Sequence, residues 1–352
     1  MDALSEVLRL VRLTGAVFLD AELSAPWAVQ SPPSHVLAQA MMPEADHMIE
    51  YHLVVEGHCF IKVADEPPIK LEQGDLVMVP RGDSHRMSSD LQPAVPVLRP
   101  SELKYPAAGE IATPRYGGGG GVTRLVCGYL AIDQRLCAAL IGALPRVFRV
   151  SAGSSEVSAW LQTYLRIRVI ERGEDQPGGA CVLAKLSELM FVEAVRRYVE
   201  SLPADQSGWL SGLKDPYVGK VLGLMHGSPT RSWTVESLAR EVGLSRSALA
   251  DRFTALIGKA PMQYLTQWRL TLAAHLLRAT SKSASVVAFE VGYESEAAFN
   301  RAFRREFGAP PATWRRSDVG STLRGASNAA ASGAAPVELR RAESSPMPAT
   351  NS

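Results

Sequence analysis

The sequence has little cysteine, no long hydrophobic run and almost no net charge. Its 352 residues include four cysteines that are far apart and form no Cys-x-x-Cys pair, which argues against a disulfide framework or a zinc knuckle and indicates reduced thiols. No apolar run reaches the roughly 18 residues of a membrane helix, and acidic residues interrupt the N-terminal segment, unlike a signal peptide. We therefore expect a cytoplasmic protein without a membrane partner.

The net charge of +1 hides an uneven distribution. Residues 215–316 contain 14 Lys and Arg against 8 Asp and Glu, or +6, whereas the rest of the chain carries 23 basic and 28 acidic residues, or −5. This division suits a module that binds a polyanion, attached to a module that does not. With 46% apolar residues the chain has enough material for a core in each of two domains.

The first 150 residues have the pattern of a β domain. Short runs such as HLVVEGHCFIKV and GDLVMVP are separated by Pro and Gly turns, which predicts antiparallel strands between about residues 15 and 86. Residues 91–121 are too rich in Pro and Gly to order fully, and VTRLVCGYLAI then resumes the strand pattern. Because a lone strand needs partners from the earlier sheet, we predict one antiparallel β-barrel over residues 1–150.

Residues 151–202 have helical periodicity. SEVSAWLQTYLRIRVIE and GACVLAKLSELMFVEAVRRYVESL both carry apolar residues at i, i+3, i+4 and i+7. These apolar stripes need a partner surface, either the chain's own barrel or a second copy of the chain, and we favour a homodimer. Residues 203–214 have the composition of a linker, and residues 317–352, which are small, polar and rich in Pro, Gly and Ala, are expected to be disordered.

The C-terminal half contains an internal duplication. SLAREVGLSRSALADRFTALIGKAP and SVVAFEVGYESEAAFNRAFRREFGAPP match piece by piece at an offset of about 50 residues. Each copy predicts a helix-turn-helix: a short helix over 235–242 or 286–291, a glycine at 243 or 292 that ends it, and Ser245 or Ser295 capping a second helix. The segment between the copies predicts one long helix starting at Pro261.

The second helix of each copy has an apolar face and a polar face. The apolar stripes, expected to face the core, are Leu249, Phe253 and Leu256, and Phe299, Phe303 and Phe307. The outward positions are Arg246, Ser247, Ala250 and Asp251 in the first copy, and Glu296, Ala297, Asn300, Arg301 and Arg304 in the second. Asn and Arg carry forked hydrogen-bonding groups that read adenine and guanine edges. A separation of about 34 Å would let both helices enter successive major grooves of double-stranded DNA.

Residues 215 to about 316 resemble the DNA-binding domain of AraC-family transcription regulators. GYESEAAFNRAFRREFGAPPATWR is similar to the C-terminal signature of that family. The resemblance implies a regulator that works with RNA polymerase, and it gives Ser247, Ala250, Asp251, Asn300 and Arg301 groove-facing roles. We expect an activator without enzymatic activity or a cofactor, while the sequence leaves activation and repression open. Asp251 departs from the family, where Arg is common, so the first module either accepts from a cytosine amino group or binds weakly.

The N-terminal half resembles cupin barrels. GDLVMVPRGDSH fits Gly-x5-Pro-x-Gly-x2-His, and EYHLVVEG resembles the strand that ends the first cupin motif. The resemblance implies a sensor for a small-molecule effector. Metal-binding cupins supply His-x-His-x3-4-Glu, but Glu44 and Asp46 stand at the two histidine positions here, while Glu50 and His85 match. His52 shares a strand face with Glu50, so we predict that Glu50, His52 and His85 contact an effector, without a metal.

The fold expected from these patterns is α+β, with a cupin-like antiparallel β-barrel, added helices and an all-α double helix-turn-helix domain. The expected function is a sequence-specific, effector-responsive DNA-binding regulator. Two alternatives remain: a metal-dependent cupin enzyme fused to a DNA-binding domain, and a thiol-based redox sensor using Cys59 and Cys127, which lie on predicted strands. For these two cysteines we favour the simpler interpretation that they are small buried hydrophobic residues.

Overall fold

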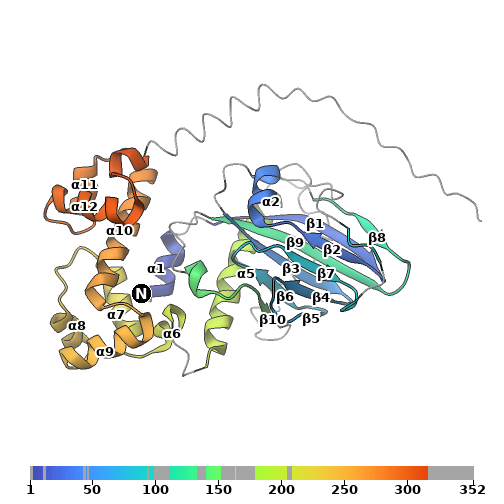
Figure 1. Cartoon of the computed structure of the whole chain (residues 1–352), viewed down its shortest axis with the longest axis horizontal. Coiled ribbons are helices and arrows are strands. Elements are labelled where there is room, and N and C mark those ends of the chain that lie inside the picture. The colour runs from blue at the N-terminus through green and yellow to red at the C-terminus, as the bar shows by residue number, and fades with distance from the viewer. Residues whose placement is uncertain are drawn as a thin grey trace, which may run out of the picture.

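The protein has a β-rich N-terminal part and a helical C-terminal part, which confirms the predicted two-domain α+β fold (Figure 1). The computed structural model describes residues 3–10, 13–42, 45, 47–92, 95–98, 111–132, 140–151, 163, 179–203 and 208–315. The tail over 317–352, predicted to be disordered, lies outside these residues. No helix in the described part of the chain combines the length and hydrophobicity that spanning a membrane requires.

Two β-sheets enclose the core of the N-terminal part. The six-stranded sheet has the order β10-β6-β3-β9-β1-β8, and the four-stranded sheet has the order β2-β7-β4-β5. The strands are β1 (Thr14–Ser24), β2 (Ala28–Ser31), β3 (His47–Glu56), β4 (His58–Val63), β5 (Ile69–Glu72), β6 (Leu76–Val79), β7 (His85–Ser88), β8 (Arg115–Gly117), β9 (Val122–Ile132) and β10 (Phe148–Val150).

One edge of the larger sheet departs from antiparallel pairing, because β8 pairs in parallel with β1. This strand belongs to the Pro- and Gly-rich segment that was not expected to order fully. Backbone hydrogen bonds from Asp20 to Ala112 and from Glu22 to Pro114, at 2.9 and 3.0 Å, hold the segment on the sheet edge. Unpaired backbone groups at a sheet edge offer hydrogen bonds to an extended segment that reaches them, so the edge orders this segment despite its composition.

Strand β3 is buried on both faces, because the four-stranded sheet lies against one face and helical residues lie against the other. Successive strand residues point to opposite sides of a sheet. Glu50 and His52 point between the two sheets, whereas Tyr51 points to helix α5 (Gly179–Ser201), where its hydroxyl lies 2.6 Å from Ser187 Oγ. A Cβ on Gly15 of strand β1, in the same sheet, would lie only 2.6 Å from the Ala184 carbonyl oxygen, so this glycine allows α5 to approach the sheet closely.

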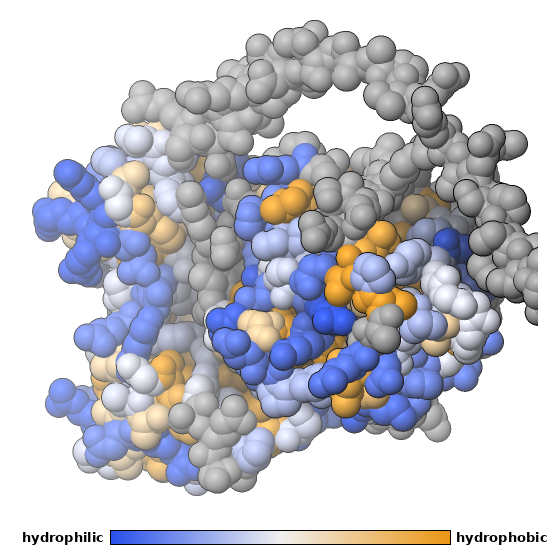
Figure 2. Space-filling view, turned by 45° about the vertical axis from the view of Figure 1, so that its right-hand side comes forward, coloured by the Kyte–Doolittle hydropathy of each residue, from blue (hydrophilic) through white to orange (hydrophobic). Residues whose placement is uncertain are grey.

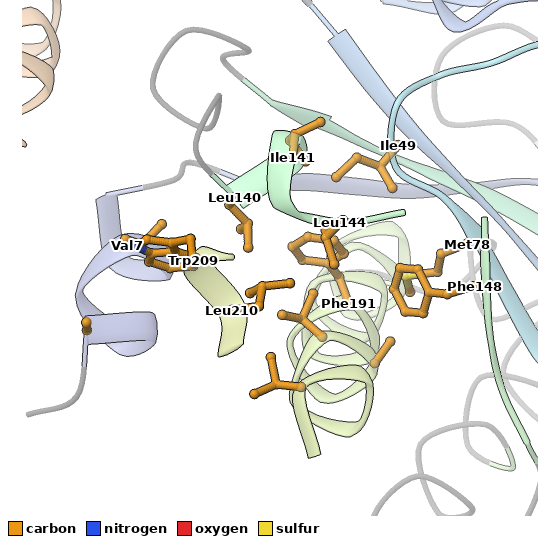
Figure 3. Packing of buried hydrophobic residues seen from close by; sticks show 14 of the residues in the cluster. Val7, Ile49, Met78, Leu140, Ile141, Leu144, Phe148, Phe191, Trp209 and Leu210 are labelled. Atoms are coloured by element: carbon orange, nitrogen blue, oxygen red, sulfur yellow. The ribbon is translucent and has the colours of Figure 1, made fainter. Parts of the chain in front are cut away.

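Helix α5 packs on the outer face of the six-stranded sheet, with Phe191 fully buried between sheet and helical residues (Figure 3). The chain's own barrel is one of the two partner surfaces that were expected for the apolar stripe of this helix, the other being a second copy of the chain. The homodimer stays a prediction, and Leu189 on the same helix remains 52% exposed. The other helix predicted in this region, over residues 155–171, lies outside the described residues apart from position 163.

The linker predicted over residues 203–214 is shorter in the structure. Its second half forms helix α6 (Trp209–Lys214), with Trp209 and Leu210 buried. Trp209 Nε1 donates to Tyr264 Oη at 2.7 Å. Burial of a large indole outweighs the local Pro, Gly and Ser composition on which the linker was predicted. Helix α1 (Ala3–Leu10) packs beside this cluster against α7 (Val218–Gly227), so both ends of the N-terminal part contact the helical part.

The remaining helices form the C-terminal part, apart from α2 (Ser34–Met41), which packs on strand β3. They are α8 (Val235–Val242), α9 (Arg246–Ile257), α10 (Pro261–Ala279), α11 (Ala284–Glu290) and α12 (Glu296–Phe307). Helix α10 has 19 residues and is about 28 Å long at 1.5 Å per residue. Helices α8 and α9 lie at one end of it, and α11 and α12 at the other (Figure 1).

Candidate DNA-binding surface and barrel site

The first helix-turn-helix, α8 and α9, has the predicted start and stop signals. Gly243 takes the left-handed conformation, with φ 74°, where α8 ends. Ser245 Oγ accepts a hydrogen bond from Ala248 N at 3.2 Å and caps α9. Thr234 and Ser237 form a reciprocal capping box at the start of α8. The sequence did not signal it, because the usual capping box has Glu or Gln at the position of Ser237.

The second helix-turn-helix, α11 and α12, repeats this arrangement. Helix α11 begins at Ala284, two residues earlier than predicted, because Ser283 Oγ accepts from Val286 N at 3.2 Å and caps it. Gly292 has φ +90°, and Ser295 Oγ accepts from Ala298 N at 3.4 Å to cap α12. The two copies therefore share their turn chemistry as well as their sequence.

The predicted apolar stripes face the core. Leu249 and Phe253 are fully buried in the first copy, as are Phe299 and Phe303 in the second. Leu256 and Phe307, the last member of each stripe, are only half-buried. Phe303 packs against Phe299, with ring centroids 5.4 Å apart. This packing fixes the rotation of α9 and α12, and with it the face that each helix presents outward.

The predicted DNA-contacting residues lie on that outward face. The seven exposed residues are Arg246, Ser247, Asp251, Glu296, Ala297, Arg301 and Arg304. The two half-buried residues are Ala250 and Asn300. Arg301 and Arg304 form no ion pair within the described residues, whereas Arg252 is held at 2.6 Å by Asp215. The part of the surface where α11 and α12 lie is mainly hydrophilic (Figure 2).

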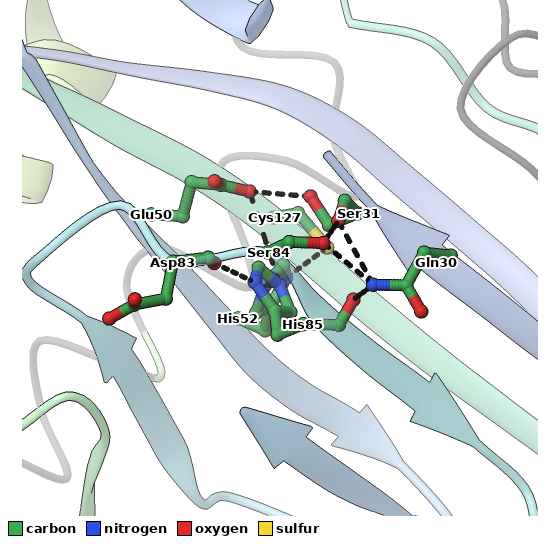
Figure 4. A network of polar contacts seen from close by, with 8 residues as sticks. All are labelled: Gln30, Ser31, Glu50, His52, Asp83, Ser84, His85 and Cys127. Carbon is green, nitrogen blue, oxygen red and sulfur yellow. Dashed lines mark hydrogen bonds and ion pairs between the residues drawn. The ribbon is translucent and has the colours of Figure 1, made fainter. Parts of the chain in front are cut away.

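The barrel site brings Glu50 and His52 of β3 together with His85 of β7, between the two sheets (Figure 4). All three side chains are buried, and one possible ligand atom from each lies within 4.8 Å of the others. His52 Nε2 is 2.8 Å from His85 Nε2, and Glu50 Oε2 is 4.0 Å from the same atom. The structure therefore places the three predicted effector-contacting residues in one cluster, while Glu44 and Asp46 lie outside the described residues.

The hydrogen bonds of the cluster determine where its protons lie. His85 Nδ1 is 3.1 Å from the Asp83 carbonyl oxygen, which only accepts, so His85 carries its proton on Nδ1 and accepts at Nε2. His52 then donates from Nε2 and accepts at Nδ1, where Cys127 Sγ lies 2.9 Å away. Ser31 Oγ donates to Glu50 Oε2 at 2.8 Å, whereas Glu50 Oε1 is buried and has no hydrogen-bond partner among the described residues.

Burial shifts the acidity of the whole cluster. It raises the pKa of Glu50 from 4.5 to about 8, against the opposing effect of the Ser31 hydrogen bond. It lowers the pKa of His85 to about 4 and that of His52 well below its usual value, the latter also because of neighbouring His85. Desolvation disfavours the charged form of every group, so the site is close to neutral at pH 7.

The two cysteines of the redox alternative are both buried. Burial raises the pKa of Cys59 to about 12, and it also raises the pKa of Cys127 well above its usual value. The thiolate is the reactive form of cysteine, so these positions favour inert thiols. Cys127 nevertheless has a polar role as the partner of His52. Neither this pairing nor the contact of Ser31 with Glu50 could be predicted from the sequence, because the strands involved are not adjacent along the chain.

Comparison with known proteins matches residues 2–200 to a family described as cupin, and residues 238–317 to a helix-turn-helix domain. The chain is 33% identical over 321 residues to an AraC-like transcription regulator of Streptomyces antibioticus, with 90% of this chain and 99% of that protein covered. It is 30% identical to the HTH-type transcriptional regulator AlkR of Acinetobacter baylyi, and this match covers 90% of this chain and 99% of AlkR. The RCS-specific HTH-type transcriptional activator RclR of Escherichia coli is 26% identical, with 90% and 97% covered.

Among solved structures, the DNA-binding domain of AdpA in complex with a target DNA is 33% identical to this chain. The match covers 29% of this chain and 92% of that domain, with a TM-score of 0.28.

Proposed function

The chain belongs to the AraC family of DNA-binding transcription regulators that carry a cupin domain, and from this premise we propose how it reads DNA and what controls it. Helices α9 and α12 enter two successive major grooves on one face of the duplex, and the barrel site binds an effector that alters this binding. The observation that supports the proposal is the pair of capped helix-turn-helix units at the two ends of α10, each with its polar face outward.

The second module is the principal reader of sequence in this proposal. Asn300 and Arg301 contact base edges, and Arg304 contacts phosphate, since these three members of the predicted contact set are exposed or half-buried and carry forked or cationic groups. In the first module Arg246 binds phosphate. Asp251 accepts from a cytosine amino group, because an acidic side chain repels the phosphate backbone.

Replacing Arg301 by alanine tests base reading. The variant should bind the preferred promoter roughly 5- to 150-fold more weakly, which corresponds to about 1–3 kcal/mol per bidentate base contact, while binding to random DNA falls much less. Arg240 is an exposed arginine on α8 that is not among the predicted contacts, so Arg240→Ala is the matched control. Fluorescence anisotropy with both DNAs at several salt concentrations measures these affinities.

Equal losses on specific and random DNA would reduce Arg301 to a phosphate contact. Loss of one phosphate contact lowers the slope of log affinity against log salt by about one. An affinity that is independent of salt, or the same for every DNA sequence, would contradict sequence-specific binding by the whole domain. Footprinting on the preferred promoter should show two protected segments about one helical turn apart for each chain.

We also propose that the chain acts as a homodimer and activates transcription through RNA polymerase. Two features support this proposal: the exposed Leu189 on α5, and a relative that is named as a transcriptional activator. Sedimentation analysis of the free and DNA-bound protein tests the dimer. In vitro transcription from the preferred promoter tests activation, and a fall in transcript on adding the protein would contradict it.

A further inference from the structure

The barrel site has the composition of a transition-metal site. Two imidazole nitrogens and one carboxylate, from Glu50, His52 and His85, converge between the two sheets (Figure 4). Nitrogen and carboxylate ligands in this ratio suit Zn²⁺ and similar borderline ions, whereas Mg²⁺ and Ca²⁺ require six or more oxygen ligands. Glu50 and His85 occupy positions of the cupin motif, whereas His52 corresponds to no ligand position of that motif.

The distances are close to those that a single ion requires. Two ligand atoms bound to a tetrahedral ion at about 2.0–2.1 Å lie about 3.3–3.4 Å apart. The two histidine Nε2 atoms are now 2.8 Å apart, and Glu50 Oε2 lies 4.0 Å from His85 Nε2. The ligand atoms of Glu50 and His52 lie within 4.8 Å of each other. Separation of the two histidines by about 0.5 Å and movement of the Glu50 carboxylate toward them by roughly 1 Å would bring all three ligand atoms to bonding distance.

The surroundings already orient the ligands. His85 donates from Nδ1 to the Asp83 carbonyl oxygen and so presents the lone pair of Nε2 to the site. His52 presents its own Nε2 lone pair once its proton moves to Nδ1, from which it is donated to Cys127 Sγ. Metal-bound histidines usually donate their second ring nitrogen to such a partner. The buried Glu50 Oε1, without a hydrogen-bond partner among the described residues, is a further group that a cation would satisfy.

We propose that Glu50, His52 and His85 bind one divalent transition-metal ion of the Zn²⁺ type, with Cys127 as a positioning residue, and that this ion is the effector of the regulator. This proposal rests on the proposed effector-controlled DNA binding, and it revises the expectation that the barrel holds no metal. Three protein ligands leave a fourth coordination position for water or a second ligand.

Strand β3 gives the ion a physical connection to the DNA-binding part. Glu50 and His52, the two proposed ligands on β3, flank Tyr51, whose hydroxyl lies 2.6 Å from Ser187 Oγ on α5. The apolar side of α5 belongs to a continuous hydrophobic cluster that includes Trp209 and Leu210 of α6 and reaches α7 and α8 (Figure 3). A shift of β3 on metal binding therefore acts directly on the helix that separates the barrel from the DNA-binding domain.

The test uses the full-length protein stripped of metal with a chelator, then titrated with Zn²⁺ or Co²⁺. We expect one ion per chain and intense visible Co²⁺ absorption, which four-coordinate Co²⁺ shows and six-coordinate Co²⁺ does not. Glu50→Gln, His52→Gln and His85→Gln should each weaken binding by more than 100-fold. His35→Gln removes an exposed histidine outside the site and should bind as wild type does.

Cys127 has its own readout. Cys127→Ala should weaken Zn²⁺ binding by about 10- to 100-fold, the usual effect of losing the partner of a metal-bound histidine. Cys127→Ser keeps a hydrogen-bond acceptor and should recover most of that loss. A sulfur-to-cobalt charge-transfer band that disappears in Cys127→Ser would overturn the assignment and make Cys127 a direct ligand. Circular dichroism of every variant separates loss of the site from loss of folding.

The outcomes separate this proposal from the proposed function. Sequence-specific DNA binding is measured first in chelator, so its failure would contradict the DNA-binding proposal whatever the metal does. One Zn²⁺ per chain together with at least a fivefold change in promoter affinity would support the metal effector. Binding of less than one ion per chain, or binding that Glu50→Gln and His85→Gln leave unchanged, would overturn the site. Stoichiometric binding without any change in DNA affinity would overturn the effector role.

Discussion

Replacing Glu50 by glutamine should stabilise the barrel increasingly as the pH rises. In the wild-type protein burial raises the pKa of this carboxyl from 4.5 to about 8. A group whose pKa is higher in the folded state favours folding fully below its unfolded pKa, and that contribution is lost as the pH rises through the folded pKa. The shift of about 3.5 units corresponds to roughly 4–5 kcal/mol, at 1.36 kcal/mol per unit.

The expected difference between variant and wild type therefore grows between about pH 5 and pH 8 and is constant above this range. Glutamine keeps an oxygen that can accept from Ser31 but has no charge to bury. Urea unfolding followed by circular dichroism at a series of pH values, in chelator to exclude metal, measures the difference. Glu66→Gln removes an exposed carboxyl and is the matched control.

Parallel pH profiles for wild type and Glu50→Gln would refute the reasoning. They would mean that ionisation of the buried carboxyl does not carry the desolvation cost inferred from burial, either because the surrounding groups move to solvate it or because the two sheets open at high pH. A profile in which Glu66→Gln changes as much as Glu50→Gln would show that net charge, and not burial, causes the dependence.

The packing of the structure leads to two further predictions. Phe303→Ala should lower the free energy of unfolding of the C-terminal part by about 3–5 kcal/mol, because it empties a fully buried site. Phe289→Ala, at a side chain that is 57% exposed, should change this free energy by less than about 0.5 kcal/mol. Thermal unfolding measures both. Gly128→Ala would place a Cβ 2.2 Å from Tyr51 Oη and should cost about 1–3 kcal/mol in urea unfolding, whereas Gly142→Ala meets nothing within 4 Å and serves as control. Equal effects within either pair would contradict the packing described.

The DNA-binding half was predictable in detail because its signals are local. Gly243 and Gly292 end helices through their own backbone conformation, and Ser245 and Ser295 cap helices through an amide three residues ahead. These interactions join neighbours in sequence, so a pattern of residue types is enough to locate them. Trp209, which precedes this half, was instead predicted to lie in a linker. Its partner Tyr264 is 55 positions away, so no local pattern indicated that it would be buried.

The barrel site was predictable only in part. Alternation along one strand placed Glu50 and His52 on the same face, and the motif spacing added His85. The contacts of Ser31 with Glu50 and of Cys127 with His52 join strands separated by 19 and 75 residues. Such contacts depend on the pairing order of the sheets, which no local pattern encodes.

The sequence by itself determined the duplicated helix-turn-helix units, their outward faces and the two-domain division, since all three follow from periodicity, capping residues and charge. Only the tertiary structure decided which partners surround the buried Glu50, how α5 and α6 connect the barrel to the DNA-binding helices, and which protons the site carries. The pKa values and the proton positions of the site depend on desolvation and hydrogen-bond geometry. Both arise only when segments that are distant in the sequence come together in the fold.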